Sequence, residues 1–248
     1  MRQVYRLSIV VILALSVGPA WADRKIYSPY VEEGVAELEI RGFRTLDHDP
    51  GKDGEQGQTY ELSYGVNSWW YTALFANLAS EPSGPLRYSG TGFENIFQLT
   101  EPGEYWIDAG AYLEYQKSSI SGQADEFEGK LLLRKDFYPF YVGANLVFNQ
   151  QFGRDRERNI GFEYAVQGVY PWKKELQFAI EAYGEPGRFS GFLPTAQQDH
   201  VLGPVLMGRF NIRGMPGGFI YEAGYLFGLT PGSPHGTVKW VFEYELAI

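Results

Sequence analysis

Residues 237–248 read TVKWVFEYELAI, and this last stretch of the chain decides the fold. In an extended strand, successive side chains point to opposite faces. One face of the stretch is then apolar throughout: Val238, Trp240, Phe242, Tyr244, Leu246 and Ile248. The other face carries Lys239, Val241, Glu243, Glu245 and Ala247. A strand with one unbroken apolar face and one charged face suits a wall between hydrocarbon and water.

The same two-faced pattern recurs upstream. Leu38 and Ile40 alternate with Glu37, Glu39 and Arg41, and residues 107–115 and 126–134 alternate in the same way. Several charges on one face of a strand would be costly to bury without partners, so that face must meet water or paired charges. We predict an all-β fold, a closed antiparallel transmembrane β-barrel of about 12 strands, each roughly 9–11 residues long.

The connections between these strands differ in length. Long polar loops are predicted near residues 47–58, 81–92, 116–125, 154–158, 185–199 and 230–236, and short turns near 67–68, 101–103, 138–139, 171–174 and 213–218. Because long and short connections alternate, all long loops should lie at one end of the barrel and both termini at the other. Outer-membrane barrels have this asymmetry. The apolar loop 185–199 can either fold inward as a constriction or pack on its neighbours.

The N-terminus predicts export. Arg2 and Arg6 precede an apolar run at 7–17, and Ala20-Trp21-Ala22 offers a small-residue cleavage site, which together predict a signal peptide over residues 1–22. The apolar run is shorter than the roughly 20 residues that a transmembrane helix needs. We expect cleavage after Ala22 and a single barrel domain over residues 23–248.

Composition excludes several classes of function. The net charge is −9, and an acidic chain is a poor partner for nucleic acid or for anionic lipid through a polybasic patch. Cysteine is absent, so disulfides and thiolate metal sites are excluded. Aromatic residues make up 17% of the chain; those near predicted strand ends could form girdles at the membrane surface, and they are Trp69, Trp70, Trp106, Tyr138, Trp172 and Trp240.

The polar face of the predicted barrel is rich in carboxylates. The side chains expected to line the lumen are Glu37, Glu39, Arg41, Glu61, Asp108, Glu114, Glu126, Glu128, Lys130, Arg134, Glu163, Glu181, Arg209, Glu222, Lys239, Glu243 and Glu245. They could line a narrow aqueous path that favours cations. They could equally form ion pairs that fill the lumen, because about twelve strands leave less room than a 16-stranded porin.

The histidines give no catalytic pattern. They number three, His48, His200 and His235, and all lie in or beside predicted loops. His48 has carboxylates on both sides, yet adjacent residues of one loop make a poor cage for a metal ion. Asp199 and His200 are adjacent in a strand and therefore point to opposite faces. We expect no metal ion, no cofactor and no enzymatic activity.

Two segments carry a resemblance to known proteins: residues 26–44, IYSPYVEEGVAELEIRGFR, and residues 94–110, ENIFQLTEPGEYWIDAG. They resemble a family of functionally uncharacterised, porin-like outer-membrane barrel proteins of Gram-negative bacteria. The resemblance implies the barrel fold, an outer-membrane location and a mature chain that starts with an acidic strand. It implies no site residue.

The closing stretch also resembles the last strand of bacterial outer-membrane barrels. That resemblance implies recognition by the barrel-insertion machinery through Trp240, Phe242, Tyr244, Leu246 and Ile248. Membrane lipid and lipopolysaccharide are the other expected partners. Arg154, Arg156 and Arg158 either bind lipopolysaccharide phosphates through forked hydrogen bonds or pair with Asp155 and Glu157 in a solvated loop.

These observations leave two main functions open. One is a narrow outer-membrane channel for small cationic or neutral solutes. The other is a non-conducting barrel that acts as a structural or interaction element through its external loops. An outer-membrane enzyme is a third.

Overall fold

The computed structural model describes residues 24–153, 156 and 158–248. The predicted signal peptide, its cleavage site and Arg154 lie outside the described residues. Within the described part of the chain, no helical segment is both long and apolar enough to cross a membrane.

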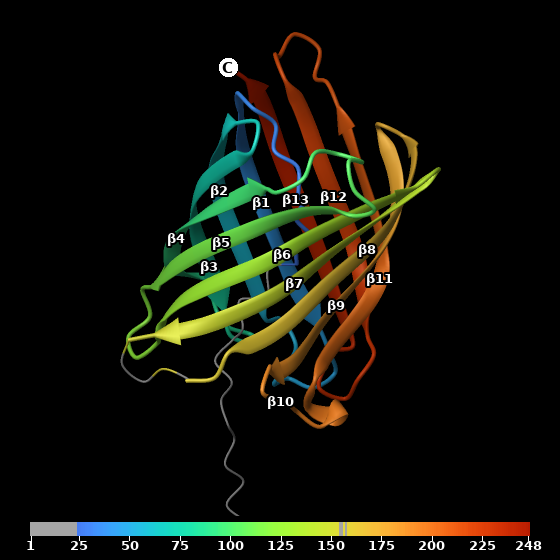
Figure 1. The fold of residues 1–248 in the computed structure, drawn as a ribbon. Helices are drawn as coiled ribbons and strands as arrows, with labels where there is room; N and C mark the ends of the chain where they lie inside the picture. The colour runs from blue at the N-terminus through green and yellow to red at the C-terminus, as the bar shows by residue number, and fades with distance from the viewer. Residues whose placement is uncertain (1–23, 154–155, 157) are drawn as a thin grey trace, which may run out of the picture.

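The strands form one closed antiparallel barrel of 12 strands, as predicted, with one additional two-residue strand (Figure 1). The strands are β1 Val35–Leu46, β2 Gln56–Asn67, β3 Trp70–Ser80, β4 Arg87–Gln98, β5 Asp108–Ser118, β6 Asp125–Phe137, β7 Phe140–Phe152, β8 Gly161–Lys173, β9 Leu176–Arg188, β10 Gly191–Phe192, β11 Asp199–Phe210, β12 Gly218–Gly228 and β13 Gly236–Ala247. Each long strand pairs with the next along the chain, and β9 pairs with β11 past the short β10 hairpin. Pairing of β1 with β13, from Val35 opposite Ala247 to Leu46 opposite Gly236, closes the ring.

The alternation of side chains sorts apolar residues to the outside. Leu62 lies opposite Leu38 on β1 and Leu74 on β3, and the three side chains are 61%, 57% and 68% exposed. Phe242 and Val238 of the closing strand are also exposed, whereas Lys239 and Val241 between them are buried. A continuous apolar outer surface of this kind favours contact with lipid rather than water.

Strand lengths and connections depart from the prediction. The strands of the barrel wall have 11–13 residues, more than the expected 9–11. The length asymmetry of the connections holds only in part, because the connections 99–107 and 211–217 lie at the turn end and are as long as several loops. Both of these longer connections are held by contacts with the rest of the barrel. Tyr30 donates a hydrogen bond to Asp108, the residue that follows connection 99–107, and Tyr244 donates to the carbonyl oxygen of Pro216 in connection 211–217.

Aromatic residues gather at both ends. Trp69, Trp106, Tyr138 and Trp172 are exposed at or beside connections of the turn end. Trp240 departs from the predicted girdle: it lies within β13 with its ring over Gly42, where an added Cβ would come within 2.6 Å of the ring. At the loop end, Phe189 and Phe192 pack on Phe162, with ring centroids 5.8 Å apart. The apolar part of loop 185–199 therefore packs on neighbouring strands, and its first residues extend β9.

The described part of the chain begins with a segment that is not a strand. Residues 24–34, which we call the lumen segment, run inside the barrel before β1 begins at Val35 (Figure 1). Arg24 contacts Asp199 at the loop end, and the Gly34 amide donates to the Gly65 carbonyl oxygen at the turn end. The lumen segment thus passes along most of the barrel interior.

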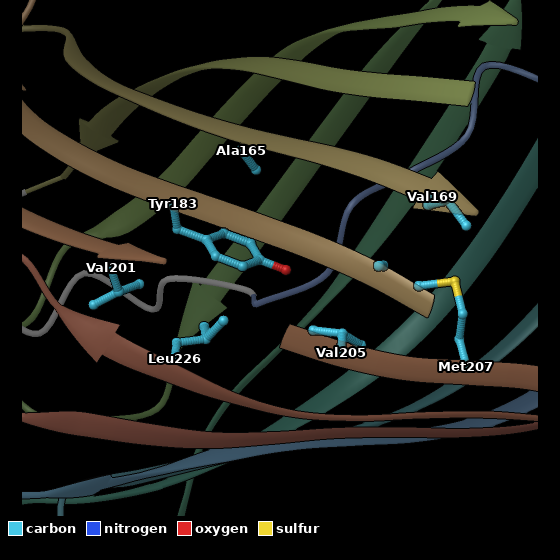
Figure 2. Close-up of a cluster of buried hydrophobic side chains, with 8 residues drawn as sticks. Ala165, Val169, Tyr183, Val201, Val205, Met207 and Leu226 are labelled. Atoms are coloured by element: carbon cyan, nitrogen blue, oxygen red, sulfur yellow. The ribbon is translucent and has the colours of Figure 1, made fainter. Parts of the chain in front are cut away.

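Two apolar clusters pack inside the barrel on either side of this segment. One cluster lies on β8, β9, β11 and β12 and is shown in Figure 2: Ala165, Val169, Ala179, Tyr183, Val201, Val205, Met207 and Leu226. The other joins Tyr27 of the lumen segment to Tyr71, Ala73, Ile96, Tyr112 and Leu132. The interior is therefore a packed core over part of its length.

Candidate functional site

The candidate site is the charged interior of the barrel. Among the residues predicted to line it, the buried ones are Glu39, Arg41, Glu61, Asp108, Lys130, Glu181, Lys239 and Glu245. The half-buried ones are Glu37, Glu114, Glu126, Glu128, Arg134, Glu163, Arg209, Glu222 and Glu243. These wall residues comprise twelve carboxylates and five basic side chains. The interior is thus strongly acidic, and its charges meet in separate groups.

Arg41 organises the first group. Its Nη1 lies 2.5 Å from Glu39 Oε1 and 2.5 Å from Glu61 Oε2, so one guanidinium bridges carboxylates on β1 and β2. Tyr71 of β3 donates to Glu61 at 3.0 Å. Guanidinium is the cation best suited to hold two carboxylates in a fixed geometry.

Lys239 of β13, the strand that pairs with β1, organises the second group. Its Nζ donates to Glu181 Oε2 at 2.7 Å and to Glu222 Oε2 at 3.1 Å. Tyr183 also donates to Glu181 at 2.7 Å. The group links β9, β12 and β13, and a buried cation with this many partners is compensated for the loss of its hydration.

The lumen segment brings two more cations into the acidic interior. Arg24 Nη2 lies 2.9 Å from Asp199 Oδ2 and 4.0 Å from Glu185 Oε1. Lys25 Nζ donates to Glu39 Oε2 at 2.7 Å, which joins it to the group around Arg41. Adjacent basic residues thus bind different strands of the wall, since Arg24 contacts β9 and β11 and Lys25 contacts β1.

The middle of the lumen segment is held through its backbone. The Tyr27 amide donates to Asn145 Oδ1 at 2.7 Å, and Asn145 Nδ2 donates back to the Tyr27 carbonyl oxygen at 3.0 Å. Tyr183 donates to the Arg24 carbonyl oxygen at 3.0 Å, and its ring is among the side chains in Figure 2. A carboxamide that uses both its donor and its acceptor on one peptide unit acts as a clamp.

The side chain of Tyr27 fills the centre of the lumen. Its hydroxyl donates to Glu94 Oε2 at 3.3 Å, and Tyr112 donates to the same oxygen at 2.7 Å. The Lys130 ammonium lies 4.3 Å from the Tyr27 ring centroid, within the range of a cation–π interaction. Polar and aromatic contacts therefore converge on one residue of the segment.

Wall contacts continue to the turn end. Tyr30 donates to Asp108 Oδ2 at 2.7 Å, and the Val31 amide donates to Gln98 Oε1 at 2.9 Å. The Ile248 amide then donates to the Gly34 carbonyl oxygen at 2.8 Å. The lumen segment is consequently anchored by polar contacts to seven strands, β1, β2, β4, β5, β7, β9 and β11, and to the C-terminus.

Little space remains beside the first residues of the segment. A cavity of about 50 Å³ lies next to Arg24, Arg41 and Glu114, and a second cavity of about 20 Å³ lies next to Lys25 and Asn145. A buried water requires about 10–15 Å³ of such space. These cavities can hold a few water molecules and no larger solute.

Three carboxylates approach one another near the turn end. One oxygen each of Glu37, Glu243 and Glu245 lies within 4.8 Å of the others. An all-carboxylate set suits hard cations, but Arg209 Nη1 lies 2.5 Å from Glu245 and Ser63 donates to Glu37. Basic and hydroxyl partners therefore already engage two of the three groups.

The histidines make contacts of ordinary loop and rim residues. His200 Nδ1 lies 3.0 Å from the Tyr164 hydroxyl, and Ser233 Oγ binds the backbone of His200 rather than its ring. Asp199 faces Arg24 instead, as alternate positions of a strand require. His48 and His235 pack edge to face, with ring centroids 5.0 Å apart.

Asp47 connects two loops at the loop end of the barrel through hydrogen bonds. The Asp49 amide donates to Asp47 Oδ1 at 2.8 Å, and the His235 amide donates to Asp47 Oδ2 at 2.8 Å. The Asp49 amide, followed by the His235 amide, lowers the pKa of the Asp47 carboxyl. These bonds connect loop 47–55 to loop 229–235.

The lumen segment was missed by the sequence analysis. It has no alternation of apolar and polar residues, so the pattern that reveals strands passes over it. The available signal is charge complementarity, because Arg24 and Lys25 precede a chain whose predicted lumen is acidic.

Comparisons with known proteins add to the description of the fold. No protein-family model matches the sequence, and no curated protein matches it. The structure of the NanC porin matches with a TM-score of 0.56 and 12% identity, over 85% of this chain and 100% of that one. The KdgM porin matches with a TM-score of 0.52 and 9% identity, over 86% of this chain and 99% of that one. The chain is thus a porin-like β-barrel in its fold.

Proposed function

We propose that this protein is an outer-membrane channel of a Gram-negative bacterium, with an acidic lumen that prefers small cationic solutes and with its N-terminal segment as an internal gate. The observation that carries the proposal is the sorting of side chains, with leucine and aromatic residues outside and twelve carboxylates inside. The fold shared with two porins and the predicted signal peptide support the location.

The acidic excess is the basis for the expected ion preference. Wall carboxylates attract cations into a narrow path and repel anions. Arg24 and Lys25 neutralise part of this charge while the segment is in place. A displaced segment would leave a wider and more acidic path.

Planar-bilayer recording tests the proposal. The variant R24E/K25E places like charges beside Asp199 and Glu39, so the segment should leave the lumen and the single-channel current should rise above that of the unsubstituted protein. A KCl gradient should give a reversal potential of the sign for potassium preference. An anion-selective current would contradict the account of the lining.

A second candidate is a non-conducting barrel that acts through its external loops. The specific observation in its favour is the filled interior around Tyr27 and Lys25. If R24E/K25E inserts, keeps its β-structure by circular dichroism and still passes no current, this second function replaces the channel.

We do not propose catalysis. Within the part of the chain that the structure describes, the contacts of His200, His48 and His235 include neither a Ser hydroxyl on a ring nitrogen nor a carboxylate cage. Nucleophilic catalysis requires a base within hydrogen-bond reach of the nucleophile.

A further inference from the structure

The barrel interior contacts residues 24–34 in the way that a binding site contacts a ligand. Among the described residues, no strand pairs with this segment along its length, and apart from the backbone bonds of Gly34 its hydrogen bonds come from single side chains on separate strands. From this we infer that the barrel interior is a binding site for an extended peptide that begins with basic residues and carries an aromatic residue shortly after them, and that the chain's own residues 24–34 occupy this site in competition with such peptides.

Backbone recognition is the first step of the argument. Asn145 binds both the amide and the carbonyl of Tyr27, Gln98 accepts from the Val31 amide, and Tyr183 donates to the Arg24 carbonyl. These hydrogen bonds recognise the backbone of an extended peptide. They can form whatever side chain the contacted residue carries.

Side-chain recognition supplies the preference. Arg24 forms ion pairs with Asp199 and Glu185. Lys25 forms an ion pair with Glu39, and a carboxylate oxygen of Glu61 lies 3.9 Å from the same ammonium. Charge-assisted hydrogen bonds of this kind are stronger than neutral ones. A small inorganic cation could satisfy the carboxylates but would leave the Asn145 and Gln98 carboxamides without their peptide partners.

The aromatic position is equally defined. The centroid of the Tyr27 ring lies 4.8 Å from that of the Tyr112 ring, and the Lys130 ammonium lies over its face. The Tyr27 hydroxyl donates a hydrogen bond to Glu94. Tyr27 is only 3% exposed. A ligand without an aromatic group here would leave the centre of this apolar cluster unfilled.

The size of the site also fits a peptide. Eleven extended residues reach at most about 36–40 Å, which exceeds the roughly 25 Å height of the apolar band of a membrane barrel. Contacts from Asp199 at the loop end to Gly65 at the turn end agree with such a span. The inference deepens the proposed function and rests on it in one respect, since a ligand from outside must be able to enter the lumen.

Peptide binding to the full-length protein tests the inference without measuring current. The probe is a synthetic peptide with the sequence of residues 24–34, RKIYSPYVEEG, labelled with a fluorophore at its C-terminal end. Its anisotropy is followed on titration with the refolded protein in micelles. We expect R24E/K25E to bind the peptide about tenfold or more tightly than the unsubstituted protein, in which the tethered segment competes at high effective concentration.

Two matched controls isolate the cause. E32K/E33K reverses two charges on the same segment at exposed positions, and it should bind the peptide as weakly as the unsubstituted protein. A peptide with Gln in place of Arg24 and Lys25 should bind R24E/K25E about tenfold more weakly, because it lacks the charged hydrogen bonds. Should R24E/K25E fail to fold, the milder K25Q takes its place in the same comparison.

The outcomes separate the two proposals. Equal peptide binding by the unsubstituted and R24E/K25E proteins, equal binding of the Gln peptide, or no binding to a folded variant would overturn the peptide site. Saturable binding without any current would instead remove the channel and leave the peptide site in place. Current that the peptide does not reduce, together with absent binding, would remove the peptide site alone.

Discussion

Lys239 shows how a single buried charge stabilises the wall. Its ammonium is fully buried beside Glu181, which is also buried. Replacement by Leu leaves Glu181 without its cation, and breaking a buried pair in this way costs about 3–5 kcal/mol. We expect K239L to lower the free energy of unfolding by that amount in a urea titration in micelles.

Lys117 provides the matched control. Its side chain is 67% exposed and lies 3.3 Å from Asp125. Exposed ion pairs contribute about 0–1 kcal/mol, so K117L should shift the urea midpoint little. A loss for K239L as small as that for K117L would contradict the stabilising role of the inner network.

Asp47 gives a prediction for pH. Because backbone amides of Asp49 and His235 bind the carboxylate, its pKa is lower in the folded protein than in the unfolded chain. The bonds therefore stabilise the two loops fully above the unfolded pKa of about 3.9, and this stabilisation is lost as pH falls through the lower folded value. A carboxyl-carbon NMR titration should place Asp47 below 3.9; a midpoint at or above it would refute the loop contact.

At the scale of elements, the lumen segment depends on the wall more than on itself. Asn145 supplies two hydrogen bonds to Tyr27. Each such bond contributes about 0.5–1.5 kcal/mol, so N145L, which removes both, should raise the open population of the segment about fivefold or more. Limited trypsin digestion followed by intact-mass measurement should show faster cleavage after Lys25 in N145L.

Asn149 lies on the same strand and face and provides the control. Its carboxamide donates to Glu163 at 2.8 Å and, among the described residues, makes no hydrogen bond to the lumen segment. N149L should leave the rate of cleavage after Lys25 unchanged. Equal acceleration by both variants would mean that general loosening of β7, and not loss of the clamp, exposes the segment.

Strands with one apolar and one polar face could be predicted, because the local alternation of residues alone determines which side chains share a face. Glu39 and Lys239 face inward as the period of two requires. In β3 both sides are apolar, so alternation does not predict which side faces the lumen; the structure places Tyr71 and Ala73 inward against Tyr27. That arrangement depends on a segment more than forty residues away in the chain, and no local pattern carries such information.

The lengths of the connections are weaker evidence for a membrane barrel than the apolar outer surface is. Two connections at the turn end, 99–107 and 211–217, are as long as loops, so the expected asymmetry between the ends is incomplete. The apolar exterior does not depend on this asymmetry. Its evidence is a set of exposed side chains in the middle of strands, such as Leu62 and Ile180.

The contact of the outer surface with lipid can be tested, because the free-energy cost of an arginine on that surface depends on its depth in the membrane. Leu62 lies near the middle of β2 on the outer surface, between Leu38 and Leu74. An arginine on the lipid face at the bilayer midplane costs about 2–4 kcal/mol, and near the membrane surface about 0–1 kcal/mol. We expect L62R to lose the larger amount in urea titrations of protein folded into lipid vesicles.

Tyr138 is the matched position at the membrane surface. It is fully exposed in the turn between β6 and β7, so Y138R should cost the smaller amount. A barrel that stood in water would tolerate arginine equally at both positions, because neither side chain is buried within the protein. Equal and small losses in L62R and Y138R would therefore contradict the membrane location itself, and with it the assignment of the charged interior as a path across that membrane.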